Sequence, residues 1–109
     1  MNAVFMDPNR AQRMAELLKA MAHPVRLQVL CLLRGGEANV SQILERLGLV
    51  QSMVSNQLAI LRVHDLVKVR RAGGFAWYRI NAERVAEVLG CLTDHASEPM
   101  TPTEDEEAP

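Results

Sequence analysis

The sequence predicts a winged helix-turn-helix, a mainly α-helical fold with one β-hairpin in the order α-α-α-α-β-β-α. The 109 residues are 49% hydrophobic but only 4% aromatic, which suits helices packed through Leu, Val, Met and Ala. Apolar residues recur at helical spacing in several segments, and the period changes to two between residues 67 and 80. We expect one domain over residues 9–98, preceded by a flexible N-terminus (residues 1–8) and followed by a disordered acidic tail (residues 99–109).

Two helices are expected in the first third of the chain. The first begins at Pro8 or Asn9, and the second covers residues 25–34, where apolar side chains occur nearly all round the helix. The second helix is therefore expected to be central and buried. Pro24 suits its first turn. The first helix has apolar residues at i, i+3, i+4 and i+7, namely Met14, Leu17, Leu18 and Met21.

Two short helices joined by a tight turn follow. Asn39 and Gln42 have the spacing of a capping box, so a helix is expected after Asn39 and is ended by Gly48. The next helix is expected from about residue 51 to residue 63. Such a pair forms a helix-turn-helix, whose second helix enters the major groove of DNA.

A β-hairpin and a last helix complete the predicted domain. The strands cover residues 67–71 and 75–80, joined by a turn at residues 72–74 that contains two glycines. Asn81 is expected to cap the last helix. The apolar stripe of that helix consists of Val85, Val88, Leu89 and Leu92.

Positive charge is concentrated in the second half of the predicted domain. The net charge is −1, but residues 99–109 hold four acidic residues and no basic one, so residues 1–98 have twelve basic against nine acidic residues. Five basic residues lie between positions 62 and 79, where Asp65 is the one acid. A local positive surface is what phosphate binding requires, although a solvated basic strand pair would show the same charge.

One face of the helix at residues 51–63 carries short, uncharged amide and hydroxyl side chains. Gln and Asn can pair with adenine edges, and Ser can donate or accept at several bases. Arginines beside the glycine turn of the hairpin can lie along phosphates or reach into a minor groove. An ordinary polar helix face is the alternative. The residues expected to contact DNA are Gln51, Ser52, Ser55, Asn56, Gln57, Arg62, Arg70, Arg71 and Gly73.

Three segments resemble the arsenic-repressor (ArsR/SmtB) family of transcriptional regulators. They are residues 17–26 (LLKAMAHPVR), residues 54–58 (VSNQL), and the two arginines at 70–71 with Trp-Tyr-Arg at 77–79. The resemblance covers about residues 10–97. It implies a winged-helix homodimer, joined through the first and last helices, that represses genes from a palindromic operator in double-stranded DNA and leaves it when an effector binds.

The sequence departs from the family pattern at two places. Val50 stands where the family commonly has a serine that caps the recognition helix, so Ser52 is expected to cap instead. His64 and Asp65 replace the usual small residue and glycine before the hairpin.

The metal-binding positions of the family are poorly matched. The arsenic and cadmium type would need thiols where this chain has residues 39–41, Asn-Val-Ser. The zinc type would need ligands at Ala82 and Arg84, and His95 with Glu98 would supply only half of a tetrahedral site. We therefore expect no metal and no cofactor, although a metal-responsive repressor with an unusual site remains an alternative.

Cys31 resembles the first thiol of the persulfide- and oxidant-sensing branch of this family (the BigR, SqrR and HlyU types). The resemblance would place the second thiol at Ser97, whereas Cys91 lies six residues earlier, about 9 Å along a helix. A disulfide needs Cα atoms within about 7 Å, so that geometry does not transfer without a shift of the last helix. Cys31 and Cys91 are the candidate effector thiols, and a buried apolar role for Cys31 is the alternative.

Other classes of function fit the sequence less well. An enzyme is not expected, because no glycine-rich phosphate loop occurs and 109 residues leave little room for a substrate pocket beside a dimer interface. A winged helix used only for protein contacts remains an alternative, against which the acid-free face of residues 51–56 argues. Apolar runs are far shorter than the ~20 residues of a membrane span, so no membrane contact and a cytoplasmic location are expected, with reduced cysteines.

Overall fold

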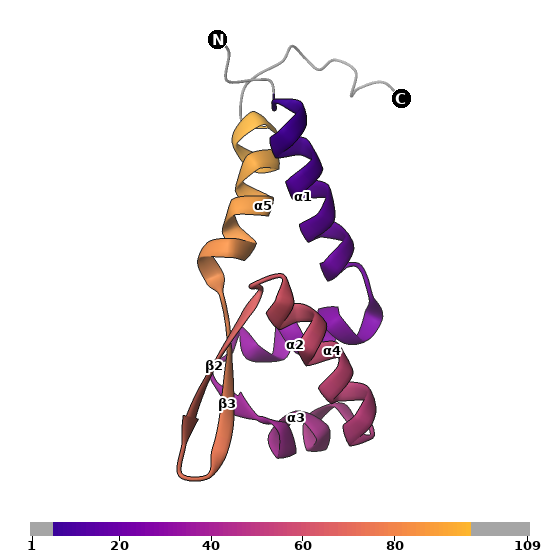
Figure 1. The fold of residues 1–109 in the computed structure, drawn as a ribbon, viewed down its shortest axis with the longest axis vertical. Coiled ribbons are helices and arrows are strands. Elements are labelled where there is room, and N and C mark those ends of the chain that lie inside the picture. Colours follow the sequence, from indigo (N-terminus) through magenta and orange to yellow (C-terminus); the bar gives the residue numbers. More distant parts are fainter. Residues whose placement is uncertain (1–5, 97–109) are drawn as a thin grey trace, which may run out of the picture.

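The computed structural model describes residues 6–96, with side chains up to residue 90. Helices α1 and α5 lie side by side at one end, and the helix-turn-helix and the sheet form the other end (Figure 1). Within residues 6–96, none of the helices combines the length and apolar character that crossing a membrane requires. The elements are α1 (Pro8–Met21), α2 (Pro24–Leu33), β1 (Ala38–Asn39), α3 (Val40–Leu47), α4 (Gln51–Val63), β2 (Val67–Ala72), β3 (Phe75–Ile80) and α5 (Ala82–Ala96).

Helices α1 and α2 both begin at a proline that follows a capping side chain. Asp7 Oδ1 accepts a hydrogen bond from the Arg10 N–H at 2.8 Å. His23 Nδ1 accepts one from the Val25 N–H at 3.1 Å. Helix α1 thus begins at Pro8, one of the two expected starts, with Asp7 as its N-cap.

Helix α2 buries one face and exposes the other, so the prediction that this helix is central and buried holds for one face only. Val29, Leu30 and Leu33 are at most 5% exposed, whereas Leu27 is 47% exposed and Cys31 also lies at the surface. The helix packs against α1, α3, α4 and β3. Periodicity could not identify the buried face because nearly all sides of this helix are apolar.

The helix-turn-helix begins with the predicted capping box. Asn39 Oδ1 accepts from the Gln42 N–H at 2.9 Å, and Gln42 Oε1 accepts from the Asn39 N–H at 3.0 Å. Gly48 ends α3 with a φ of 66°, a left-handed conformation that favours glycine. Helix α4 begins after Val50 with no side-chain cap, so the expectation that Ser52 caps it is wrong.

The sheet has a third strand that the sequence did not indicate. Strand order is β1-β3-β2, all antiparallel, and Asn39 of β1 pairs with Trp77 of β3. The element order is thus α-α-β-α-α-β-β-α, and β1 was missed because two residues show no alternation. Gly73 and Gly74 alone form the turn between β2 and β3, both with positive φ, as two-residue hairpins commonly require.

Helix α4 ends in a Schellman motif built on a residue other than glycine. The N–H of Leu66 bonds the carbonyl of Leu61, and the N–H of Asp65 bonds that of Arg62, each at 2.9 Å. Asp65 therefore has a φ of 60°, where this position favours glycine. Asn81 caps α5 as predicted, and its Nδ2 also donates to the Asp65 carbonyl at 2.8 Å.

A row of ion pairs on the surface runs from Lys68 on β2 through Asp65, Arg84 and Glu87 to Arg13 on α1. Lys68 lies 3.6 Å from one Asp65 oxygen and Arg84 lies 3.2 Å from the other, which lowers the pKa of Asp65, chiefly through the Arg84 hydrogen bond. Arg84 also approaches Glu87 at 3.8 Å, and Glu87 pairs with Arg13 at 2.7 Å. Helices α1 and α5 are thereby tied to the base of the hairpin.

The conformation of Asp65 leads to a test of local strain. Asp65→Gly and Asp65→Ala both remove the carboxylate, but only alanine keeps a Cβ in the left-handed region. We expect the glycine variant to have the higher free energy of unfolding, by about 0.5–1 kcal/mol after its extra unfolded-state entropy is subtracted. Urea unfolding measures this, and equal midpoints would show that φ imposes no strain at Asp65.

Candidate nucleic-acid interface

Helix α4 presents the predicted polar face to solvent. Val54, Leu58 and Leu61 are at most 1% exposed and fix the opposite side of the helix in the core. This anchoring holds the polar side chains on a rigid element, which suits direct contact with base edges. The exposed polar residues of the first turns are Gln51, Ser52, Ser55 and Asn56.

Gln57, also expected to contact DNA, is half-buried and engaged within the protein. Its Oε1 accepts a hydrogen bond from Arg26 Nη1 at 2.7 Å. Arg26 Nε also donates to the carbonyl of Ala20, near the end of α1. Arg26 therefore connects α1, α2 and α4, a role that the sequence did not indicate because its partner in α4 is 31 residues away.

A hollow lies between α4 and the sheet, beside the exposed polar face. Its volume is about 450 Å³. Arg62 lies on its rim, exposed and without an ion pair in the described part of the chain. A guanidinium in this position can meet a phosphate of a duplex that lies against α4. The lining residues are Ser55, Leu58, Ala59, Arg62, Val63 and Tyr78.

The two arginines of the hairpin differ in their surroundings. Arg70 Nε and Nη2 donate to the two carboxylate oxygens of Glu37, each at 2.8 Å, and its guanidinium lies 6.0 Å from the centre of the Trp77 ring. Arg71 is exposed near the turn and makes no ion pair within the described residues. Gly73 is exposed at the tip. Glu37 was not predicted as a functional residue, because its partner Arg70 is 33 residues away and no local pattern marks the pair.

The Glu37–Arg70 hydrogen bonds lower the pKa of Glu37 and raise that of Arg70, and the charges of Arg70 and Arg79 lower the Glu37 pKa further. The ion pair thus stabilises the fold above the unfolded-state pKa of Glu37, and its contribution is lost as the pH falls through the lowered pKa.

This linkage gives a pH-dependent prediction. Glu37→Gln should unfold at a lower urea concentration than the wild type at pH 7, because it removes the charged pair. The difference should shrink as the pH falls below 4.5, the ordinary value for this carboxyl group. Glu45→Gln is the matched control, since Glu45 makes no ion pair within residues 6–90. A difference that stayed constant down to pH 3 would contradict the pairing.

The two candidate effector thiols belong to α2 and α5. The Cys31 thiol lies at the surface of α2, and Cys91 belongs to α5, with its side chain outside the described part. Arg84, at a position where the zinc type needs a ligand, is engaged with Asp65 and Glu87. Among the residues described, no three His, Cys, Asp or Glu side chains are grouped so as to hold a metal ion. Ser97 and Glu98 lie outside the described residues.

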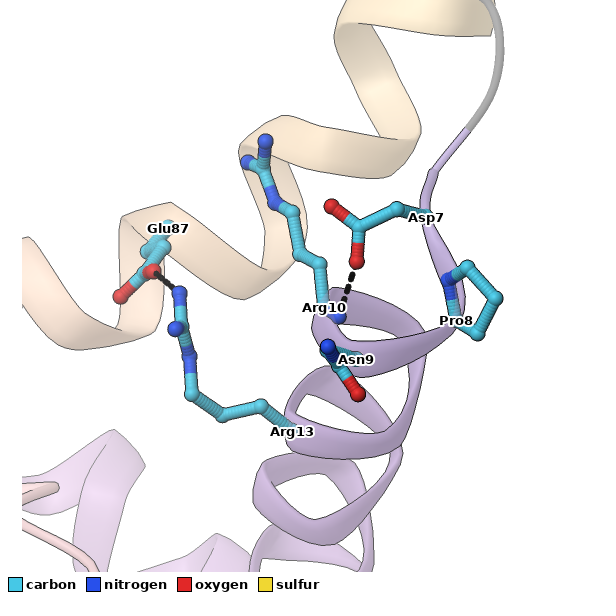
Figure 2. Close-up of a pocket in the computed structure, with 6 residues that line it drawn as sticks. All are labelled: Asp7, Pro8, Asn9, Arg10, Arg13 and Glu87. Atoms are coloured by element: carbon cyan, nitrogen blue, oxygen red, sulfur yellow. Dashed lines mark hydrogen bonds and ion pairs between the residues drawn. The ribbon is translucent and has the colours of Figure 1, made fainter.

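A second hollow, of about 790 Å³, lies where α1 meets α5 (Figure 2). Arg10 and Arg13 extend from α1 toward α5, where Arg13 pairs with Glu87. This contact holds together the two helices that the family resemblance assigns to dimerisation. Asp7, Pro8 and Asn9 complete the lining.

Comparison with known proteins agrees with this arrangement. Residues 23–69, from the start of α2 into β2, match the family described as bacterial regulatory protein, arsR family. The biofilm growth-associated repressor of Xylella fastidiosa is 36% identical over 83 residues, which are 76% of this chain and 73% of that protein. The transcriptional activator HlyU of Vibrio cholerae is 38% identical over 92 residues, 84% of each chain.

Solved structures of HlyU from Vibrio cholerae have the same fold. One has a TM-score of 0.69 at 36% identity and covers 82% of this chain and 96% of its own. Another, of reduced HlyU, also has a TM-score of 0.69, at 33% identity, and covers 83% and 95% of the two chains. The shared fold therefore extends over more than four fifths of this chain.

Proposed function

This chain belongs to the ArsR family of bacterial transcriptional regulators, and from that premise we propose that it is a homodimeric repressor, released from a palindromic operator by an effector. The observation that carries the proposal is the polar face of α4, exposed to solvent while the opposite face is fixed in the core. The chain is a regulator and not an enzyme. The protein it resembles in Xylella fastidiosa is named a repressor, which supports this direction of control.

Within this proposal the exposed side chains divide into two groups. Gln51, Ser52, Ser55 and Asn56 contact base edges from the major groove. Arg62 and Arg71 contact phosphates, and Gly73 lets the tip of the hairpin approach the backbone closely.

The proposed dimer uses α1 and α5. Leu18 on α1 is 39% exposed and Leu89 on α5 is 47% exposed in the single chain. Apolar side chains on two adjacent helices favour association with a second copy, which would remove them from water. Two copies of α4 then read two half-sites about one helical turn of DNA apart.

Selection of bound duplexes from a pool with a randomised 30-base-pair region tests the proposal. We expect enrichment of one inverted repeat and a complex of two chains per duplex. Enrichment without symmetry would contradict binding as a dimer, and no enrichment would contradict sequence-specific binding.

The base-reading role of α4 leads to a prediction for Asn56→Ala. Loss of a bidentate base contact should weaken binding to the selected duplex by about 1–3 kcal/mol and leave binding to unrelated duplex unchanged. Fluorescence anisotropy measures both affinities. Gln28→Ala, which removes the same amide from an exposed position on α2, is the control and should change neither. An equal loss on both duplexes would contradict a base contact.

For the effector we propose thiol chemistry at Cys31. Its exposure on α2 supports access by a small oxidant. A peroxide would convert the thiol to a sulfenic acid with release of water, and a second thiol, such as Cys91, would displace the hydroxyl group to form a disulfide and a second water. A sulfane-sulfur donor would instead transfer its outer sulfur to the Cys31 thiolate and leave as a thiol. Attack by the second thiol on the Cys31 sulfur would then expel hydrosulfide and form a disulfide.

The test is release from the selected duplex by peroxide and by a persulfide donor, with Zn(II), Cd(II) and As(III) in parallel. Cys31→Ser should bind DNA normally and resist release, and mass spectrometry should identify the modified thiols in the wild type. Normal release of Cys31→Ser, or release by a metal alone, would contradict the proposed thiol switch.

A further inference from the structure

The side chain of Arg70 is committed to a contact within the protein. Both donors on one edge of its guanidinium bond the carboxylate of Glu37, and the plane lies near the Trp77 ring. A two-pronged Arg–carboxylate contact fixes orientation as well as distance. Arg71, the next residue, pairs across the hairpin with Ala76 and has no acidic partner within the described residues.

Glu37 is placed where it can control the angle of the hairpin. It lies between Gly36 and β1, and the second residue of β1, Asn39, is the cap of α3. Because the strand order is β1-β3-β2, the Glu37–Arg70 bond reaches across β3 to the outer strand. Trp77 of β3 lies opposite both Asn39 and Arg70, and its indole N–H donates to the Ala72 carbonyl at 3.3 Å. The two hydrogen bonds between Arg70 and Glu37 thus join β2 of the hairpin to the start of the helix-turn-helix.

We propose that Glu37 is a positioning residue for DNA binding: through Arg70 it sets the hairpin against the helix-turn-helix, and Arg71 supplies the phosphate contact of the hairpin. This proposal rests on the proposed DNA-binding function. It assigns different roles to Arg70 and Arg71, both of which the sequence predicts to contact DNA. If the Arg70 guanidinium moved to a DNA phosphate, its two charge-assisted hydrogen bonds to Glu37 would be exchanged for similar bonds to the phosphate. The hairpin would also lose its link to the start of α3. Arg71 gives up no ion pair when it meets DNA.

Whether Glu37→Gln strengthens or weakens DNA binding distinguishes this proposal from direct contact between Arg70 and a phosphate. Glu37→Gln removes a negative charge near the DNA and releases Arg70. If Arg70 contacts phosphate, this change should strengthen binding and steepen its salt dependence. If Glu37 positions the hairpin, the change should weaken binding to the selected duplex about three- to tenfold despite the loss of a negative charge, with no steeper salt dependence.

Charge exchange gives a second test. Arg70→Glu should weaken binding to the selected duplex more than tenfold, and the double variant Glu37→Arg with Arg70→Glu should recover to within about fivefold of the wild type. Arg71→Glu combined with Glu37→Arg is the matched control and should show no such recovery. In a mixed-sequence 30-base-pair duplex, Arg71→Ala should reduce the slope of log affinity against log salt by about 0.9 per chain, or about 1.8 for the bound dimer, whereas Arg70→Ala should leave it unchanged.

Circular dichroism should show that every variant is folded, and Arg70→Lys replaces Arg70→Glu if the latter is not, with an expected loss of binding and no change of slope. Failure of the double variant to recover, or stronger binding by Glu37→Gln, overturns the positioning role while DNA binding by the wild type still stands. A wild type that binds neither duplex overturns the proposed function itself and, with it, this inference.

Discussion

Replacement of Leu89 by glutamate is expected to leave the chain folded and to abolish tight operator binding. Leu89 is 47% exposed on α5, so a carboxylate stays hydrated in the single chain. In the proposed dimer the same carboxylate would be removed from water without a partner. Loss of the dimer separates the two recognition helices and removes the advantage of linked half-sites, typically a factor of about 10²–10⁴ in affinity.

Sedimentation equilibrium and fluorescence anisotropy on the selected duplex measure the two effects. Leu89→Met is the matched control, since it keeps an apolar side chain of similar volume and should retain both the dimer and the affinity. A Leu89→Glu variant that remained dimeric and bound the duplex normally would show that α5 does not form the interface in this way.

The second large effect is expected in the core, from Leu61→Ala. Leu61 has no exposed surface and fixes the C-terminal half of α4. Its truncation should lower the free energy of unfolding by about 2–5 kcal/mol, through lost burial and a cavity that closes only in part. Urea unfolding measures the loss. Ile60→Ala, at a neighbouring position that is 36% exposed, should cost much less, and equal losses would contradict the assigned packing of α4.

The parts of the fold that depend on neighbouring residues could be predicted from the sequence. Helix α4 begins at Gln51 and ends at Val63 as expected, and the capping box of Asn39 and Gln42 is present with both bonds. Capping, helical periodicity and glycine turns act within a few residues, so their signals lie in a short window. The exposed face of α4 followed from the same periodicity.

What could not be predicted depends on contacts between distant segments. The hydrogen bonds from Arg26 to Gln57 and from Arg70 to Glu37 join residues 31 and 33 positions apart, and no local pattern marks either partner. Strand β1 exists because β3 is beside it, since two residues have no periodicity of their own. The surface position of Cys31 was missed because only the packed fold decides which side of an apolar helix faces the core.

The ion-pair row from Lys68 through Asp65, Arg84 and Glu87 to Arg13 makes ionic strength act on this protein twice. The Debye length is about 8 Å at 0.15 M salt and becomes shorter as salt is added, so ion pairs at the surface weaken. Salt therefore loosens the tie between the α1–α5 pair and the hairpin while it competes for DNA phosphates. The fall of operator affinity should be steeper than the phosphate contacts alone would cause. Two variants that both keep this ion-pair row should still differ in salt slope only by the number of phosphates that each contacts.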